Sequence, residues 1–385
     1  MRIETRLAER LKKINPSSTL AITSKAKKLK EEGKDIISLA AGEPDFDTPD
    51  FIKDAAIEAI KSGFTKYTPT TGIPDLKKCI CEKFKKDNLL DYDPDQIVVS
   101  CGAKHSIFNI LLALVDRTDE VLIPTPYWVS YPEMVNLCEG TPRFIKTLPE
   151  NNFKITIKDL EKYINPATKV LILNSPSNPT GSVYAEDELK EIARLCVLKK
   201  IFVISDEIYE KIIFDNRSHS SIASFGKEIY DMTITVNGMS KSYSMTGWRI
   251  GYIGAPPDIA EAISRIQDHS TSNPTSISQK AAVAALKAPD EFSKTMCVEF
   301  EKRRDYIASR LKKMKRMGFV MPQGAFYLFP KVGDGDIATA RLAKAGVIVV
   351  PGSAFGPGGK EHIRLSYASS RENLEEALRR MKGIL

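Results

Sequence analysis

The feature that most constrains the fold of this chain is a regular alternation of short apolar runs with amphipathic runs along its middle. Runs that predict strands lie at residues 96–100, 120–123, 168–173, 201–204, 233–236 and 250–254, and runs that predict helices lie at 103–114 and 185–198. Because the strand runs are almost wholly apolar, both of their faces are expected to be buried. The pattern therefore predicts an α/β fold with a mainly parallel sheet covered by helices on both sides.

The two ends of the chain have a different pattern. An amphipathic helix or arm is expected at residues 4–13 and a strand at 36–39. Later come long helices at 276–288 and 290–317, short strands near 324–330, 347–350 and 362–367, and a last helix at 371–382. These ends predict a smaller α+β unit. We expect an arm at 1–13, a small domain made of 14–46 and 284–385, and a large domain at 47–283.

Composition excludes several classes of protein. The net charge of +7 is spread among acids, and the basic cluster at 312–316 predicts a solvated helix end, so no nucleic-acid partner is expected. No apolar run reaches the roughly 18 residues of a membrane span, and residues 1–6 do not form a secretory signal. The six cysteines lack a CxxC motif, which favours free thiols in a cytoplasmic protein. The four histidines lack ligand spacing, so no metal is expected.

A lysine and an arginine, Lys241 and Arg249, mark the first chemically specific segment, SKSYSMTGWR at residues 240–249. An amine condenses with an aldehyde, and an arginine fork holds a phosphate through two parallel hydrogen bonds. Pyridoxal phosphate carries both groups, so the segment could hold it at two ends. A solvated surface lysine is the ordinary alternative. The segment lies between two strand runs, however, which would fix the lysine on a rigid scaffold.

An acid, Asp206, follows the apolar run 201–204 almost directly. A carboxylate at such a strand end is poorly solvated and needs a cationic partner, such as a protonated pyridine nitrogen. Tyr209, three residues later, could reach the phenolic oxygen of the same ring. The alternative for Asp206 is a helix N-cap.

Three further strand ends carry residues suited to a ligand, which in open α/β sheets binds beyond the carboxyl ends of the strands. Gly102, Ala103 and Lys104 open a helix whose free N–H groups favour a phosphate, although a tight turn would give the same pattern. Trp128 could stack on a flat ring or pack in the core. Asn178, in a proline-rich turn, offers both a donor and an acceptor.

Together these motifs resemble those of fold-type I pyridoxal-phosphate enzymes, and most of all the class I aminotransferases of the bacterial aspartate aminotransferase branch. The resemblance covers essentially the whole chain. It is carried by the segments at residues 16–17, 41–46, 67–72, 174–181, 205–209, 240–251 and 362–367. It implies a large domain on a mainly parallel seven-stranded sheet, a smaller α+β domain, pyridoxal 5′-phosphate as cofactor, and a homodimer.

The resemblance also implies a role for each site residue. Lys241 would be the Schiff-base lysine, and Asp206 would pair with the ring nitrogen. The other implied cofactor contacts are Tyr209 and Asn178 at the ring oxygen, Trp128 on the ring face, Gly102, Ala103, Lys104, Ser240 and Arg249 at the phosphate, and Tyr67 at a phosphate across a dimer interface. Arg364 would bind the substrate α-carboxylate, with Gly42, Trp128 and Asn178 nearby. An arginine inside an apolar run needs a carboxylate on physical grounds too, although a structural ion pair would satisfy it.

Substrate choice depends on fewer residues. In this branch the lysine after the phosphate-site glycine, here Lys104, often binds the distal carboxylate, assisted by a hydroxyl such as Ser18 or Thr19. The resemblance therefore implies small-molecule substrates, with L-aspartate and 2-oxoglutarate converted by a ping-pong mechanism. Members that also use prephenate tend to carry a basic residue where this chain has Asn15, which argues against prephenate.

Three other functions fit parts of the sequence. One is an aminotransferase of broader specificity for aromatic amino acids, alanine or prephenate. Another is a C–S β-lyase on the same scaffold, which would give pyruvate and ammonia. A transcription regulator with an aminotransferase-like domain would need a DNA-binding module, and only about 35 residues precede the first strand of the family pattern.

Overall fold

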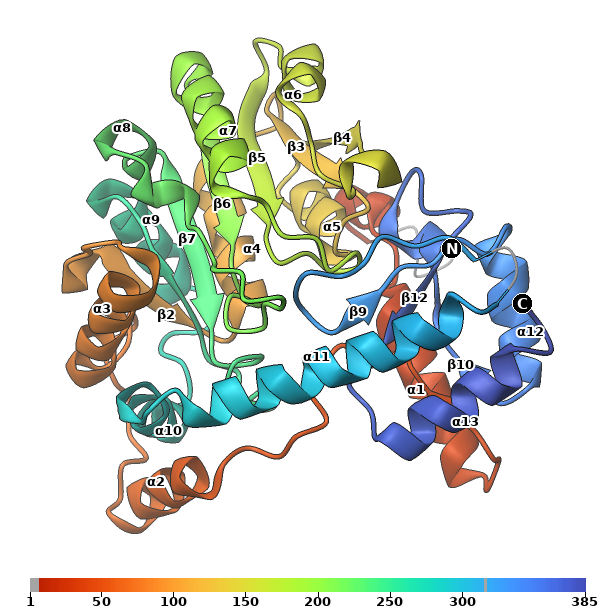
Figure 1. Ribbon diagram of the computed structural model, residues 1–385. Helices are drawn as coiled ribbons and strands as arrows, with labels where there is room; N and C mark the ends of the chain where they lie inside the picture. The colour runs from red at the N-terminus through yellow and green to blue at the C-terminus, as the bar shows by residue number, and fades with distance from the viewer. Residues whose placement is uncertain (1–6, 315–316) are drawn as a thin grey trace.

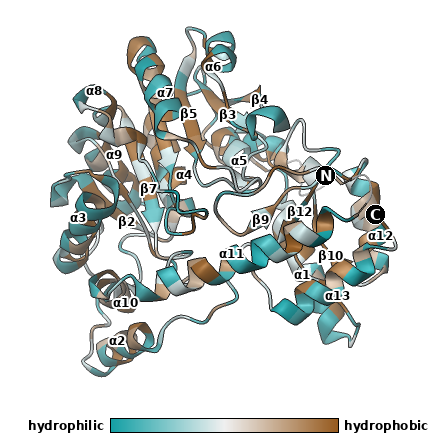
Figure 2. Cartoon of the chain, viewed as in Figure 1, coloured by the Kyte–Doolittle hydropathy of each residue, from teal (hydrophilic) through white to brown (hydrophobic). Residues whose placement is uncertain are grey.

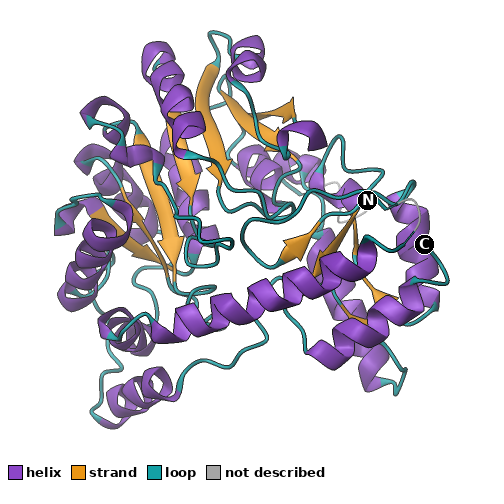
Figure 3. Ribbon diagram, viewed as in Figure 1, coloured by secondary structure: helices purple, strands orange, loops and turns teal. Residues whose placement is uncertain are grey.

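The structure is a computed structural model that describes residues 7–314 and 317–385, and it consists of a large and a small part joined by one long helix (Figure 1). The helix is α11 (Glu291–Leu311), which runs from beside α10 to the small part. In Figure 3 the strands of the large part and the short strands of the small part form separate groups.

A seven-stranded sheet forms the centre of the large part. Its strands are β2 (Ile97–Ser100), β3 (Glu120–Thr125), β4 (Thr141–Lys146), β5 (Thr168–Asn174), β6 (Phe202–Asp206), β7 (Thr233–Gly238) and β8 (Gly251–Gly254). Their order is β2-β8-β7-β6-β5-β3-β4, and only β8 runs antiparallel to its neighbours. The predicted α/β class and the mainly parallel seven-stranded sheet are thus confirmed.

Helices cover both faces of this sheet, because successive strand residues point to opposite sides. Ile123, Ile172 and Ile204 pack with α4 (Ala103–Leu114), α5 (Ser130–Leu137) and α9 (Pro257–Asp268). Their neighbours Leu122, Leu171 and Val203 pack on the other face with α6 (Ile157–Tyr163), α7 (Glu186–Lys199) and α8 (Lys227–Tyr230). At the β2 edge this second face carries α2 (Asp50–Lys61), α3 (Pro74–Asn88) and α10 (Ser276–Lys287). Figure 2 shows apolar colour on the sheet between helices with hydrophilic outer faces.

The small part combines segments from both ends of the chain. β1 (Ile37–Ser38) pairs in parallel with β10 (Val347–Ile348), and β11 (Val350–Pro351), β12 (Ile363–Ser366) and β9 (Tyr327–Leu328) form an antiparallel sheet. The helices α1 (Ser18–Glu31), α12 (Gly335–Lys344) and α13 (Arg371–Met381) complete it. The expected α+β unit is present; the exact domain boundaries stay a prediction.

Two sequence predictions need adjustment. The helix expected to reach residue 317 ends at Leu311. The apolar pattern continues past that point because Met314 and Met317 pack against the same core from outside the helix. The expected arm contains a short 3₁₀ helix, Glu9–Lys13, while residues 4–6, 315 and 316 lie outside the described residues. No helix in the described part of the chain is long and apolar enough to span a membrane.

Candidate active site

A cavity of about 300 Å³ lies at the carboxyl ends of β5 and β6, where the large sheet meets the N-terminal segment. Its lining includes the strand-end residues Asn174 and Asp206, and the segment from Ala40 to Glu43. This is the edge at which parallel α/β sheets bind ligands. The cavity brings together most of the residues predicted from the sequence: Thr19, Gly42, Ala103, Lys104, Trp128, Asn178, Asp206, Tyr209, Ser240, Lys241, Arg249 and Arg364.

Asp206 is a buried carboxylate at the last position of β6, with 4% of its surface exposed. Its Oδ2 accepts a 2.5 Å hydrogen bond from the Tyr131 hydroxyl, and its Oδ1 accepts one of 3.3 Å from the Ile208 N–H. Burial raises the pKa of Asp206 to about 6, although these two hydrogen bonds oppose the rise. No helix follows β6 directly, so Asp206 is not a helix N-cap, and among the described residues it forms no ion pair, although the charge of Lys241 in the same cavity acts on it.

Lys241 lies on the connection between β7 and β8, as the sequence predicted. Its Nζ donates a 2.5 Å hydrogen bond to the carbonyl oxygen of Gly42. Burial lowers the pKa of Lys241 to about 8, and the positive charges of Arg249 and Arg364 add to the decrease, while Glu43 opposes it. A lysine of this kind supplies a neutral amine close to physiological pH, which is the form that attacks an aldehyde or removes a proton.

The N-terminus of α4 forms the anion-binding end of the cavity. The helix begins at Ala103 after Gly102, whose φ of 91° is a conformation that glycine adopts without strain. Arg249 lies beside this turn, since its guanidinium donates to the carbonyl oxygens of Thr246 at 2.8 Å and Cys101 at 3.3 Å. The first N–H groups of a helix and an arginine are the usual donors for a phosphate.

Arg364 lies at the small-part side of the cavity and is only 2% exposed. Its guanidinium donates to Asn178 Oδ1 at 3.1 Å and to the Ala40 carbonyl oxygen at 2.6 Å, while its Nε has no partner among the described residues. No carboxylate of the described chain pairs with it, so the alternative of a structural ion pair is not seen. A buried arginine with spare donors is suited to a ligand carboxylate.

A second cation, Lys104, lines the same cavity from the first turn of α4. Its Nζ lies 5.0 Å from the ring centroid of Trp128, and Trp128 packs edge-on against Tyr131. Burial, and then the charge of Arg249, lower the pKa of Lys104. Thr19 and Ser17, from the N-terminal segment, also line the cavity, and their hydroxyls lie 3.2 Å apart. Ser18, the other hydroxyl considered, is not among the lining residues.

Two predicted residues lie outside this lining. Gly102 is the N-cap just before the lining residue Ala103. Tyr67 is 92% exposed and does not join the cavity within one chain. A tyrosine so exposed is consistent with a role at an interface, which one chain does not test.

Sequence reasoning missed four residues of the site. Tyr131 binds Asp206, and Asn174 donates to the Asp206 carbonyl oxygen at 3.0 Å while accepting from the Asn178 N–H at 2.9 Å. Tyr327 places its hydroxyl 2.9 Å from that of Tyr209, and Glu43 lines the cavity. Asn174 could have been found as the polar end of an apolar strand run. The other three follow turns or short strands and gave no such signal.

The donor set of the cavity fits pyridoxal phosphate. It offers a buried acid for a ring nitrogen, an amine of lowered pKa for an aldehyde and a helix N-terminus with an arginine for a phosphate. Gly102 also leaves room for the guanidinium of Arg249, which a Cβ atom at this position would displace. Each chemical group of the cofactor thus has a matching group in the protein.

Comparisons with known proteins agree with this chemistry. The family model of aminotransferase class I and II matches residues 34–381. An aspartate aminotransferase of Geobacillus stearothermophilus is 48% identical over 98% of both chains, and a probable aspartate/prephenate aminotransferase of Aquifex aeolicus is 47% identical over 98% of both. The solved structure of an aspartate aminotransferase from Thermus thermophilus with maleate superposes with a TM-score of 0.95 at 40% identity, covering both chains fully.

The match of the family model to nearly the whole chain, the full-length relatives and the donor set of the cavity lead to one conclusion. This chain belongs to the class I and II aminotransferases, enzymes that use pyridoxal 5′-phosphate.

Proposed function

We propose that this chain transfers the amino group of L-aspartate to 2-oxoglutarate, giving oxaloacetate and L-glutamate. The observation that carries the proposal is the pair of cations Arg364 and Lys104. Both line the cavity that holds Lys241, and neither has an ion-pair partner within residues 7–314 and 317–385. With Lys241 and Arg249 assigned to the cofactor, these two remaining cations suit a substrate with two carboxylates. The relatives named for aspartate and the neighbour solved with maleate, a four-carbon dicarboxylate, support the same substrate class.

Each residue has a defined task in the proposed reaction. Arg364 binds the α-carboxylate with charge-assisted hydrogen bonds, and Asn178 holds the guanidinium in place. Lys104 and Thr19 face the distal carboxylate. Pyridoxal phosphate, when bound, would supply an aldehyde for the substrate amine and a ring able to draw electrons from the substrate α-carbon. These positions orient the α-hydrogen for the base.

Lys241 is the proposed base. Its lowered pKa leaves a substantial neutral fraction near pH 8, so its Nζ can take the α-proton of the substrate and would deliver it to the carbon that the cofactor aldehyde supplies. Asp206 holds a proton on the ring nitrogen, and the Tyr131 hydroxyl keeps its carboxylate in place. The backbone N–H groups of Ala103 and Lys104, together with Ser240 and Arg249, are the proposed phosphate contacts, with Gly102 shaping the turn. Trp128 is the proposed stacking partner of the ring, and Tyr209 and Asn178 the proposed partners of its oxygen.

We also propose that the chain works as a homodimer in the cytoplasm. Tyr67 is 92% exposed, and the neighbouring α2 exposes Phe51, Ile57 and Ile60. A second copy would bury this apolar surface and bring Tyr67 to the partner's phosphate site. All six cysteines are free thiols, which supports a reducing compartment.

Prephenate is a second candidate substrate, because the Aquifex aeolicus relative is named for it. The structure gives one argument against it. Asn15 is bound to Glu133, through its backbone N–H at 3.0 Å and its side-chain amide at 3.2 Å, and it brings no positive charge to this region.

The proposed function is tested with Lys104→Gln in single-turnover reactions with L-aspartate and L-alanine. Loss of a charge-assisted contact costs about 1.5–3 kcal/mol, so kcat/KM for aspartate should fall roughly 10–100-fold while alanine, which lacks the distal carboxylate, changes little. With 2-oxoglutarate present, the products from aspartate should be oxaloacetate and glutamate, whereas release of pyruvate and ammonia from a cysteine S-conjugate would indicate a lyase. An unchanged rate with aspartate would contradict the proposal.

A further inference from the structure

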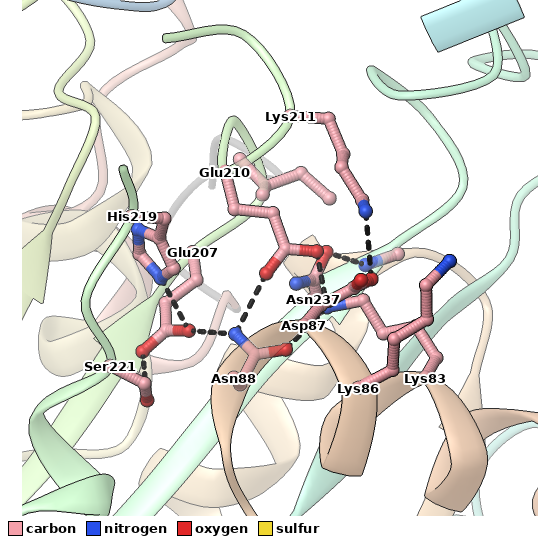
Figure 4. Close-up of polar contacts among 12 residues, drawn as sticks. Lys83, Lys86, Asp87, Asn88, Glu207, Glu210, Lys211, His219, Ser221 and Asn237 are labelled. Carbon is pink, nitrogen blue, oxygen red and sulfur yellow. Dashed lines mark hydrogen bonds and ion pairs between the residues drawn. The ribbon is translucent and has the colours of Figure 1, made fainter. Parts of the chain in front are cut away.

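A buried polar network lies directly behind Asp206, on the other side of the strand end. Its centre is formed by Glu207, Glu210, Asn88, Lys83 and His219, and Figure 4 shows these side chains pointing toward one another from α3, from the turn after β6 and from the loop at 219–221. Glu207 and Glu210 are 1% and 7% exposed. None of the five residues lines the cavity.

The alternation of the strand explains why this network and the active site share one backbone. Ile204 packs with α4 and α5, and Asp206 lies on that side and meets Tyr131 of α5. Ser205 and Glu207 therefore point to the opposite side. The Glu207 N–H donates to the Val236 carbonyl oxygen at 2.9 Å, so the residue continues the pairing of β6 with β7. A change in the position of Glu207 therefore shifts the backbone of Asp206, since one peptide unit joins the two residues.

Glu207 is held by four donors. Its Oε1 accepts from the hydroxyls of Ser205 and Ser221, both at 2.7 Å, and its Oε2 accepts from Asn88 Nδ2 and His219 Nε2, both at 2.8 Å. These donors occupy the four lone-pair positions of a carboxylate. All four acceptor positions of Glu207 are therefore filled by donors within the network.

The charges of the network nearly cancel. The Asn88 amide also donates to Glu210 at 2.8 Å, and Glu210 forms an ion pair with Lys83. Burial is the largest single effect on His219 and lowers its pKa, but the charge and hydrogen bond of Glu207 together with the charge of Glu210 raise that pKa above its ordinary value, which favours the protonated form. The carboxylates of Glu207 and Glu210 then face the cations of His219 and Lys83. Glu207, Glu210 and Lys83 are also the charged groups that act on His219.

Glu207, Glu210 and His219 could by distance hold a metal ion. The hydrogen bonds argue against that use, because Asn88 already donates to both carboxylates and Glu207 has no free lone pair. The network is better understood as a set of fixed charges beside the active site.

We propose that Glu207 positions Asp206 and strengthens it as an acceptor for a protonated ring nitrogen, and that protonated His219 moderates this effect. A nearby negative charge increases the affinity of a carboxylate for a proton, and a nearby positive charge decreases it. Glu207 indeed acts to raise the pKa of Asp206, after the larger effect of burial. The inference rests on the proposed function, in which Asp206 binds the ring nitrogen of the cofactor.

The test compares a variant that removes a negative charge from the network with one that removes a positive charge. The measured quantity is the dissociation constant of pyridoxamine 5′-phosphate, a form of the cofactor that binds without a covalent bond. In Glu207→Gln the amide can donate to the serine hydroxyls and still accept from Asn88 and His219, so the shape is kept and the charge is lost. One pKa unit of proton affinity corresponds to a factor of 10, so this variant should bind about tenfold more weakly. Glu207→Asp, which keeps the charge, should bind more tightly than Glu207→Gln.

Substitution of His219 should change the dissociation constant in the opposite direction. His219→Gln removes a positive charge and can still donate to Glu207, so the cofactor should bind as tightly as in the unchanged protein or more tightly. A matched control is Glu188→Gln on α7, which removes the partner of the buried Lys154 at 2.6 Å and which shares no hydrogen bond or ion pair with Asp206 or the network. It should lower the melting temperature but change the dissociation constant less than twofold.

The outcomes separate the inference from the function on which it depends. If Asp206→Asn leaves the dissociation constant unchanged, the ring-nitrogen role of Asp206 is wrong. If Asp206→Asn weakens binding but Glu207→Gln behaves like Glu188→Gln, only the role of Glu207 is refuted. Equal weakening by Glu207→Gln and His219→Gln would also overturn it, because a merely structural network would lose binding in both. If Glu207→Gln does not fold, the sign of the His219→Gln effect decides.

Discussion

At the scale of single residues, the site depends on charged groups that are held away from water. Asp206 and Arg364 are almost fully buried, and Arg364 lacks a carboxylate partner in the described chain. Such burial costs free energy, which a bound ligand can offset by supplying the opposite charge. The residues that bind the ligand are therefore expected to lower the free energy of unfolding of the ligand-free protein.

This cost predicts that Asp206→Asn stabilises the cofactor-free protein at neutral pH. The pKa of Asp206 is about 6 in the fold against 3.8 ordinarily, so the folded state binds more protons between these values. The free energy of unfolding therefore falls as pH rises from about 4 to 6, and it falls no further through this group above pH 6. The difference of 2.2 units corresponds to about 3 kcal/mol.

Urea denaturation at pH 7 and pH 4 checks this prediction. Asp206→Asn should raise the free energy of unfolding by up to about 3 kcal/mol at pH 7 and have little effect at pH 4. Asp47→Asn, at a side chain 94% exposed, is the control and should change it by less than about 1 kcal/mol at either pH. An equal loss of stability at both pH values would contradict the account.

At the scale of elements, the strands that form the site were predictable and several helices were not. Parallel strands buried on both faces are continuous apolar runs, so β3, β5, β6 and β7 stand out in the sequence. The edge strand β4 was missed because most of its residues are at least partly exposed. Helix α1 was missed because only Ala26 is buried, which leaves no clear apolar stripe.

The close approach of β8 to the start of α4 gives a prediction for the phosphate end. A Cβ atom on Gly251 would collide with the backbone of Gly102 and Ala103, whereas one on Gly247, in the preceding loop, meets no atom within 4 Å. Gly251→Ala must therefore displace the helix N-terminus, at a cost of about 1–3 kcal/mol. Gly247→Ala is the matched control.

Calorimetry and phosphate-ester binding measure both effects. Gly251→Ala should lower the melting temperature by several degrees and weaken binding of pyridoxamine phosphate at least about fivefold, while Gly247→Ala should change neither appreciably. If the two variants behave alike, the turn is not the phosphate site or has more room than the structure shows.

At the scale of the whole molecule, the exposed apolar face of α2 predicts the dimer. Ile57→Glu with Ile60→Glu should shift the sedimentation mass from two chains to one and weaken cofactor binding, because Tyr67 would no longer reach the partner's site. Leu198→Glu places the same charge at a leucine that is 73% exposed on α7 and should leave the mass unchanged. A chain that sediments as a monomer before any substitution would refute the dimer.

The assembly of the site was predictable where strand ends carry the chemistry and not where the small part contributes. Asp206, Asn178 and Lys241 lie on the edge of one sheet, and parallel topology alone brings them together. Glu43 lines the cavity and Tyr327 contacts the lining residue Tyr209 through tertiary packing, which depends on how the small part sits on the large one. No local pattern in the sequence encodes that arrangement.

The central claim is that Lys241 binds the cofactor and moves the substrate proton. The most direct measurement is the visible absorption of the protein loaded with pyridoxal phosphate, before and after L-aspartate is added without an acceptor. We expect a visible band that aspartate abolishes and 2-oxoglutarate restores. In Lys241→Ala the conversion should slow by about 10²–10⁴-fold, the usual contribution of a general base. A Lys241→Ala protein that converts aspartate as fast as the unchanged one would contradict the claim.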